Sequence, residues 1–302
     1  MLPRIALLFQ TLIAAGTFLI AKDATTRFEP VVLVWFRIVF AGVFMAVLFL
    51  ARHRRLPSFT RAEWGRVVIL GLTGVLLNQG LFLTGLAATT PLHASLLYAC
   101  TPVMVLIAAV LWFGETWSWL RFVGVGLAVT GVALLLAARG LDLSAGPLRG
   151  DLVILAAVAA WSAFTLLGKS ILRRHGALTV IATAFAVAAL AVLPLGPWIL
   201  RGFDTRGPGL TGWLDLVYLG VVTSGVAFTL WYWALGRLEA SQTAVFTNLQ
   251  APMTAILVWL VYGDTPGYGS LIGGALVIAG VSMTQRPVGF AGAARRRAPE
   301  AG

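Results

Sequence analysis

Ten long apolar runs, separated by short polar connections, constrain this chain more than any other feature of its sequence. The runs hold about 17 to 24 residues each, and about 20 apolar residues let one helix cross the hydrocarbon core of a bilayer. We expect ten membrane spans at residues 5–21, 31–51, 67–88, 92–113, 121–138, 152–171, 177–200, 213–235, 240–262 and 268–284.

The composition supports a membrane protein. Hydrophobic residues make up 59% of the 302 residues and charged residues 11%, and the mean hydropathy is +0.92. A soluble domain carries roughly 25% charged residues. The runs are continuous and do not alternate as the strands of an outer-membrane barrel do. We therefore predict an all-α membrane protein with ten transmembrane helices.

The basic residues predict the orientation. With the N-terminus in the cytoplasm, fifteen of the 22 Lys and Arg residues fall in cytoplasmic segments and six in outer ones, while Arg37 lies within a span. Loops rich in Lys and Arg stay inside. This predicts an inner-membrane protein with both termini in the cytoplasm. The net charge of +11 is scattered between spans, so we expect no nucleic-acid partner.

An internal repeat is visible in the sequence. Residues 124–132 read GVGLAVTGV and residues 273–281 read GGALVIAGV, at an offset of 149 residues. The same offset aligns Gly71 with Gly220. Such self-similarity indicates two copies of one structural unit.

The repeat divides the chain into two halves. We expect a first repeat at 1–138, a linker at 139–151, a second repeat at 152–284 and a basic cytoplasmic tail at 285–302. Each repeat holds five spans, and because five is odd, the second repeat enters the membrane from the opposite side. Inverted repeats are common in secondary transporters, with the substrate site near the midplane between the halves.

Polar side chains inside the spans are the candidates for substrate binding, because a polar group in hydrocarbon is costly unless it has a function or a partner. Asn and Gln both donate and accept hydrogen bonds, which suits a zwitterionic or polar ligand. Hydrogen bonding between helices, and ordinary packing of the tryptophans, are the alternatives. The candidates are Gln10, Asn78, Gln79, Tyr98, Trp161, Trp231, Asn248 and Gln250.

Five further residues are candidates for gating or structure. Pro102 and Pro252 lie at equivalent points of the fourth and ninth spans, where proline interrupts a helix. Arg37 in the second span needs a polar partner or must reach the interface, so we expect a gating or structural role and no direct ligand contact. Glu115 and Asp264 follow glycines at the ends of the fourth and ninth spans.

Several chemistries have no signature here. The sequence has no Walker loop, no HExxH or GxSxG motif, and a single cysteine, Cys100. We expect no ATP hydrolysis, no metal, no cofactor and no enzymatic activity. No acidic residue falls in the middle of an expected span, which leads to the hypothesis of a facilitator, an exchanger or a weakly proton-coupled carrier.

Six segments carry a family resemblance. In the first half they read VWFRIVFAG, ASLLYACTPVMVLIAAVLWFGE and RFVGVGLAVTGVALLL; in the second, GDLVILAAVAAWSAFTLLGK, YLGVVTSGVAFTLWYWALGRL and AVFTNLQAPMTAILVWLVYGD. Over nearly its whole length the chain resembles the EamA-type permeases of the drug/metabolite transporter superfamily. It departs from them at Asp264, where Glu is frequent, and at Ala14-Ala15, where Trp-Gly is frequent.

The resemblance implies a secondary transporter that exports amino acids or related small polar or amphipathic metabolites by alternating access. A nucleotide-, sugar- or drug-like substrate is the alternative within the same fold, and a membrane scaffold without transport is the alternative outside it. The expected partners are a small-molecule substrate and the lipid bilayer, with the chain acting as a monomer or a homodimer.

Overall fold

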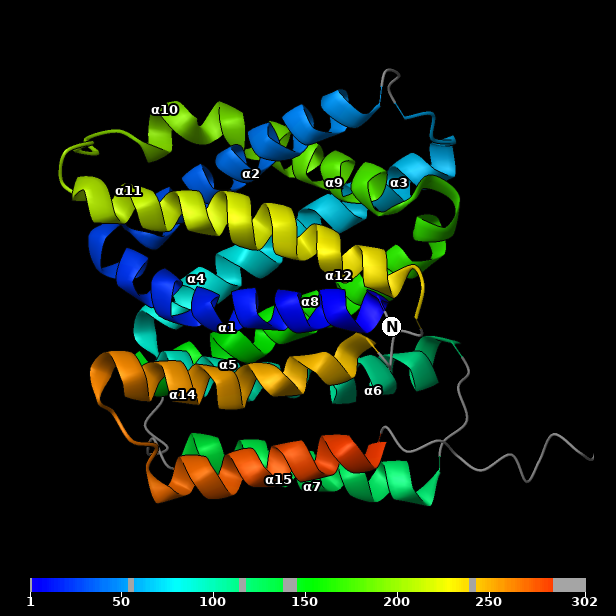
Figure 1. The fold of residues 1–302 in the computed structure, drawn as a ribbon, viewed down its shortest axis with the longest axis vertical. Helices are drawn as coiled ribbons and strands as arrows, with labels where there is room; N and C mark the ends of the chain where they lie inside the picture. The colour runs from blue at the N-terminus through cyan, green and yellow to red at the C-terminus, as the bar shows by residue number, and fades with distance from the viewer. Residues whose placement is uncertain (1, 54–56, 114–117, 138–145, 239–242, 285–302) are drawn as a thin grey trace, which may run out of the picture.

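The computed structural model of the chain is a bundle of long helices that lie side by side (Figure 1). It describes residues 2–53, 57–113, 118–137, 146–238 and 243–284, and no strand occurs in these ranges. The first half of the sequence forms α1 (Leu2–Arg27), α2 (Pro30–Arg52), α3 (Arg61–Leu70), η1 (Gly71–Leu77), α4 (Asn78–Ala88), α5 (Pro91–Tyr98), α6 (Thr101–Phe113) and α7 (Trp119–Ala137).

The second half forms a similar series of elements. These are α8 (Gly146–His175), α9 (Ala177–Val192), η2 (Leu193–Leu195), α10 (Gly196–Ile199), α11 (Gly209–Val217), η3 (Tyr218–Ala227), α12 (Phe228–Leu235), η4 (Val245–Leu249), α14 (Gln250–Tyr262) and α15 (Tyr268–Thr284). Among the described residues, seven helical stretches are long and apolar enough to cross a membrane, and three shorter apolar helices lie at Trp119–Leu135, Phe246–Tyr262 and Tyr268–Met283. The all-α, ten-span prediction is confirmed.

The two ends of the bundle are distinct. We call the end at which α1 begins and α15 ends the terminal end, at right in Figure 1. We call the other end, where α1 ends and α15 begins, the vestibule end. Successive spans run in alternating directions between them, so each half has an odd number of crossings and the second half starts from the end opposite to the first.

The helices begin where local chemistry favours a start. Thr60 and Glu63 form a capping box at α3, since each side chain bonds the backbone N–H of the other. The α5 helix starts with Pro91, and the Thr90 side chain accepts a hydrogen bond from the backbone N–H of His93. These caps define where the third and fourth spans begin.

The fourth and ninth spans are interrupted next to their prolines, as the sequence predicts. The fourth span breaks between α5 and α6, and Pro102 has no N–H for the Tyr98 carbonyl. The Thr101 hydroxyl donates to that carbonyl instead, at 2.6 Å. The ninth span contains the 3₁₀ segment η4 after a short helical stretch at 243–244, and it becomes α-helical again two residues before Pro252. A gating role for the two prolines stays a prediction.

The last helices of the two halves, α7 and α15, pack directly on each other at the lower edge of Figure 1. A Cβ atom added to Gly131 would lie 2.7 Å from the Gly273 carbonyl oxygen, and one added to Gly280 would lie 2.5 Å from that of Gly124. The repeat offset exchanges Gly124 with Gly273 and Gly131 with Gly280, so each contact maps onto the other. Such reciprocal contacts are the mark of a two-fold axis.

This axis confirms the inverted repeat. The α7 and α15 helices run in opposite directions (Figure 1), and a two-fold axis that relates antiparallel helices lies across them, in the plane of the membrane. Two π-helical segments obey the same relation, because η1 begins at Gly71 and η3 at Tyr218, 147 residues later. π-helical turns are frequent at functional sites.

We expect Gly131→Ala to lower the free energy of unfolding by about 1–3 kcal/mol, because its Cβ would meet backbone atoms of α15 that cannot rotate away. The matched control is Gly126→Ala on the same helix, where an added Cβ meets nothing within 4 Å. Thermal unfolding in detergent measures both. Equal stability of the two variants would contradict the close helix contact.

Candidate functional site

A narrow cavity of about 70 Å³ lies in the middle of the bundle, between the two halves. The first half contributes side chains from α1, α2, α4 and α5, and the second half contributes side chains from α8, η3, α12 and α14. Six of the eight substrate-binding candidates line it: Gln10, Asn78, Gln79, Tyr98, Trp161 and Gln250. We call this space the central cavity.

Asn78 holds the wall of the central cavity together. Its Nδ2 donates to the Tyr98 hydroxyl at 3.1 Å and to the Ala157 carbonyl at 2.8 Å. One side chain thus ties α4 to both α5 and α8. Because both donors of this amide are engaged, Asn78 has less capacity to bind a ligand than the sequence suggests.

Other polar atoms in the central cavity have no hydrogen-bond partner among the residues that the structure describes. Gln10 Oε1, both side-chain polar atoms of Gln79, and Arg37 Nη1 are buried without a hydrogen bond. Native proteins satisfy the great majority of their buried polar groups with protein or water partners. Donors and acceptors that remain available in one cavity are suited to a polar ligand.

Aromatic rings form the apolar part of the same cavity. Phe18, Phe82 and Tyr98 contact one another edge-on, with ring centroids 5.6–5.8 Å apart, and Trp161 meets Phe228 at 5.0 Å. Binding pockets for small molecules combine apolar walls with a few placed polar groups. They also hold about 300–1,000 Å³, so the central cavity must widen before it admits a metabolite.

Two candidates lie outside the lining of the central cavity. Trp231 is fully buried behind Trp161, with ring centroids 5.5 Å apart. Asn248 belongs to the 3₁₀ segment η4, and its Oδ1 is buried without a partner. Gln250, two residues later, reaches the cavity because it starts α14. Substrate contact by Trp231 and Asn248 stays a prediction.

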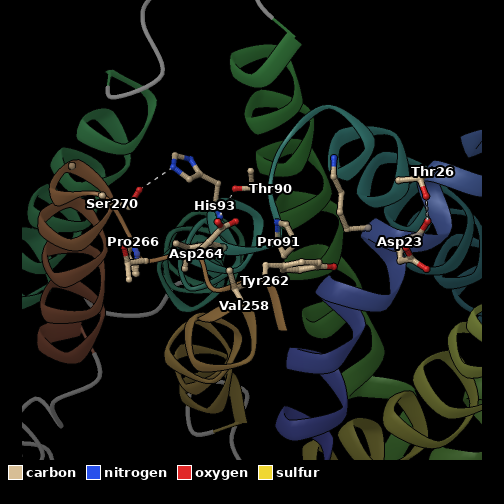
Figure 2. A pocket seen from close by; sticks show the side chains of 15 residues that line it. Asp23, Thr26, Thr90, Pro91, His93, Val258, Tyr262, Asp264, Pro266 and Ser270 are labelled. Atoms are coloured by element: carbon tan, nitrogen blue, oxygen red, sulfur yellow. Dashed lines mark hydrogen bonds between the residues drawn. The ribbon is translucent and has the colours of Figure 1, made fainter. Parts of the chain in front are cut away.

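A second and larger space of about 730 Å³ opens at the vestibule end of the bundle. Figure 2 shows its walls, with His93 and Ser270 on one side and Asp23 and Thr26 on the other. Asp264, expected to serve in gating, lies in this vestibule. Glu115, its counterpart in the first repeat, is outside the described residues.

The vestibule and the central cavity share three helices, α1, α5 and α14. On α1, Phe18 lines the cavity and Lys22 lines the vestibule one turn later. On α14, Gln250 lines the cavity and Val258 the vestibule, about 12 Å further along the helix. The vestibule therefore leads along these helices toward the central cavity. The structure is wide at the vestibule end and contracted at the centre.

Lys22 joins α1 to the end of α4. Its Nζ donates to the carbonyl oxygens of Leu86 at 3.0 Å and Ala87 at 2.9 Å. The last carbonyls of a helix lack intrahelical partners and attract a cation. The contact fixes α1 beside the vestibule, which Lys22 also lines.

A buried cluster beside the vestibule is not predicted from the sequence. Asp151 is fully buried; it accepts a hydrogen bond from the Thr89 hydroxyl and pairs with His93 Nδ1 at 3.0 Å. His93 Nε2 lies 3.1 Å from the Ser270 hydroxyl, a contact that Figure 2 shows. The cluster connects α5, α8 and α15 across the two halves.

The position of Asp151 bears on what the sequence predicts for the acidic residues. Asp151 is the sixth residue of α8, so it lies near the outer end of this span and not in its middle. The sequence placed Asp151 in the linker and His93 at a span end. Both residues fall at the outer end of their spans, and this shared position was the only feature of the sequence that could have suggested a contact between them. The hypothesis of a facilitator, an exchanger or a weakly proton-coupled carrier rested on the absence of acidic residues from the middle of the spans, and it stays a prediction.

The comparisons with known proteins decide the family. The EamA-like transporter family matches the chain twice, over residues 2–137 and 148–285. The chain belongs to the EamA-like transporter family. An uncharacterized transporter of Archaeoglobus fulgidus is 30% identical over 90% of this chain and 93% of its own length. A probable terminal-alkyne amino-acid exporter of Streptantibioticus cattleyicolor is 30% identical over 73% of this chain and 72% of its own.

A solved crystal structure supports the fold. It is 22% identical to this EamA-like protein, covers 91% of this chain and 96% of its own, and superposes with a TM-score of 0.62. The family and these relatives are transporters and not enzymes. The chain is thus a multi-pass membrane protein of a transporter family. Its partners are a small-molecule substrate and the lipid bilayer.

Proposed function

We propose that this EamA-like protein exports small polar or amphipathic metabolites, amino acids foremost, as a secondary transporter. The observation that carries the proposal is the central cavity, which combines unpartnered polar atoms with aromatic walls between two inverted repeats. A relative at 30% identity is named a probable amino-acid exporter. Nucleotide-, sugar- or drug-like substrates, and a scaffold without transport, are the alternatives that the experiment below tests.

The mechanism that we propose is alternating access. The structure has a wide vestibule at one end and a contracted cavity at the centre. If the two halves exchange their conformations, the opening moves to the terminal end while the cavity stays in place. The lining of the central cavity includes side chains from both halves of the chain, so a movement of one half against the other would change the shape of the cavity.

The proposed orientation follows the basic residues. Arg4, Arg52, Arg61 and Arg174 lie at helix ends on the terminal end of the bundle, and loops rich in Lys and Arg stay in the cytoplasm. We place both termini in the cytoplasm of an inner membrane, with the vestibule open to the outside. Export then means loading at the terminal end and release through the vestibule.

Counterflow in proteoliposomes tests the proposal. Vesicles are preloaded with unlabelled amino acids, nucleosides, sugars or a cationic drug in separate batches, and entry of the labelled compound is followed. We expect accumulation with amino acids. Accumulation with another class instead would show that this class is the substrate. No accumulation with any class, from folded protein, would favour a membrane scaffold without transport.

We expect Gln79→Leu to slow amino-acid counterflow about tenfold. Leucine has a similar volume but neither donates nor accepts, and a hydrogen bond to a charged ligand group contributes about 1.5–3 kcal/mol. The comparison variant is Asn248→Leu, in which the replaced amide is buried outside the cavity. If the cavity alone binds the substrate, this variant retains most of the wild-type rate. The reverse ranking of the two variants would move the substrate site to η4.

A further inference from the structure

We propose that Arg37 is the residue that binds a carboxylate of the transported substrate in the central cavity. This inference rests on the proposed function and assigns one end of the substrate to one side chain. It replaces the gating or structural role expected from the sequence, in which Arg37 would reach the membrane interface or serve only the packing of helices.

The position of Arg37 is inconsistent with a side chain that extends to the interface. Arg37 lies on α2 with 3% of its surface exposed, and it lines the central cavity. Its Cζ lies 5.8 Å from the centroid of the Phe82 ring, a residue of the same cavity. The guanidinium therefore points to the middle of the bundle, where the substrate of an inverted-repeat transporter binds.

One edge of the guanidinium is fixed by the protein. Arg37 Nε donates to the Ser224 hydroxyl at 3.0 Å, and that hydroxyl donates to the Leu219 carbonyl at 2.8 Å. Leu219 precedes Ser224 by five residues, and both belong to the π-helical segment η3. Ser224 thus sets the orientation of the Arg37 side chain through a local irregularity of the eighth span.

Another part of the guanidinium remains available. Arg37 Nη1 is buried without a hydrogen-bond partner. A guanidinium stays protonated at neutral pH, and a buried charge is costly unless an opposite charge pairs with it. Of the described side chains that line the central cavity, none is acidic. An anionic group of the molecule that the cavity binds would supply this countercharge.

The chemistry of the lining favours a carboxylate on a zwitterionic molecule. Guanidinium binds carboxylates through charge-assisted hydrogen bonds. The amide oxygens of Gln10 and Gln79 lack partners and can accept from an ammonium group. The ring of Trp161 offers a face for the ammonium group or for an apolar side chain. An α-amino acid with an apolar side chain carries all three matching groups.

Paired substrates test the inference. Counterflow is measured with leucine and with leucinamide, which keeps the ammonium group and the side chain but lacks the carboxylate. In the wild type we expect leucine to exchange at least tenfold faster. Arg37→Gln should slow leucine at least tenfold and change leucinamide less than twofold, while Arg37→Lys should restore part of the leucine rate. Thermal unfolding in detergent establishes that each variant is folded.

Ser224→Ala separates positioning from binding. It removes the fixed edge of the guanidinium but leaves its charge, so KM for leucine should rise while kcat and the leucinamide rate stay close to wild type. Equal loss of leucine and leucinamide exchange in folded Arg37→Gln would overturn the inference and support a structural role. If the wild type exchanged only probes without a carboxylate, the inference about Arg37 would be overturned, but the proposed transport function would remain. Absence of exchange with every probe would overturn the proposed function itself.

Discussion

A membrane-impermeant thiol reagent added from the outside is expected to stop transport almost completely in a Leu92→Cys variant. Leu92 lies near the start of α5 and lines the vestibule, and Tyr98 of the same helix lines the central cavity. A bulky adduct at this position would stand between the outside and the cavity. Blocked exchange of a labelled amino acid after treatment is the measurement.

The protein offers its own controls for this experiment. Cys100 is the single cysteine and is buried, with 4% of its surface exposed. The protein without the Leu92→Cys substitution should therefore be insensitive to the reagent. Thr205→Cys adds an exposed thiol between α10 and α11, away from the vestibule, and should react without loss of transport.

The result also tests the orientation. Reaction of Leu92→Cys only with reagent enclosed inside the vesicles, in protein of known insertion, would place the vestibule end in the cytoplasm. Labelling without inhibition would remove the vestibule from the transport path. Reaction from the inside only would contradict the proposed orientation but not alternating access. Labelling without inhibition would contradict the proposed transport path and with it this form of alternating access.

The ten spans and the two repeats could be predicted because both are patterns within the linear sequence. The length of an apolar run matches the thickness of the bilayer, and a constant offset between similar segments indicates a repeat. The same reasoning found most of the central cavity, since an amide such as Gln79 is too costly inside a span without a purpose. These signals need no knowledge of how the helices pack.

The remaining features depend on packing. Gln250 and Asn248 are two residues apart, and the sequence does not show that Gln250 is the one that lines the central cavity. His93 and Asp151 come from different halves, and nothing along the sequence pairs them. For Arg37, the decisive facts are its bond to Ser224 and the unpartnered Nη1, which appear only once α2 lies beside η3.

The repeat symmetry also exposes a difference between the two halves. Thr17 on α1 corresponds to Phe164 on α8, 147 residues later, and Thr223 in η3 corresponds to Gly74 in η1, at 149 residues. At the first crossing the two threonine hydroxyls share a hydrogen bond of 2.8 Å. At the equivalent crossing Phe164 occupies the space that a side chain at Gly74 would fill.

Gly74→Ala is therefore expected to destabilise the protein strongly, by about 3 kcal/mol. The added Cβ would lie 1.8 Å from a carbon of the Phe164 ring, and Phe164 is fully buried, so either the ring or the helix must move. Gly80→Ala is the matched control on the same span, because its Cβ meets nothing within 4 Å. That control should be neutral or slightly stabilising, since alanine favours helix over glycine. Denaturant or thermal unfolding in detergent compares the two.

A double-mutant cycle assigns the cause. Phe164→Ala alone should cost about 3–5 kcal/mol through the cavity that it leaves. In the Phe164→Ala background, Gly74→Ala should cost little, because the ring that its Cβ would strike is gone. If Gly74→Ala destabilises both backgrounds equally, the glycine is required by the π-helical backbone of η1 and not by Phe164. The cycle thus separates a packing requirement between the two halves from a backbone requirement within one span.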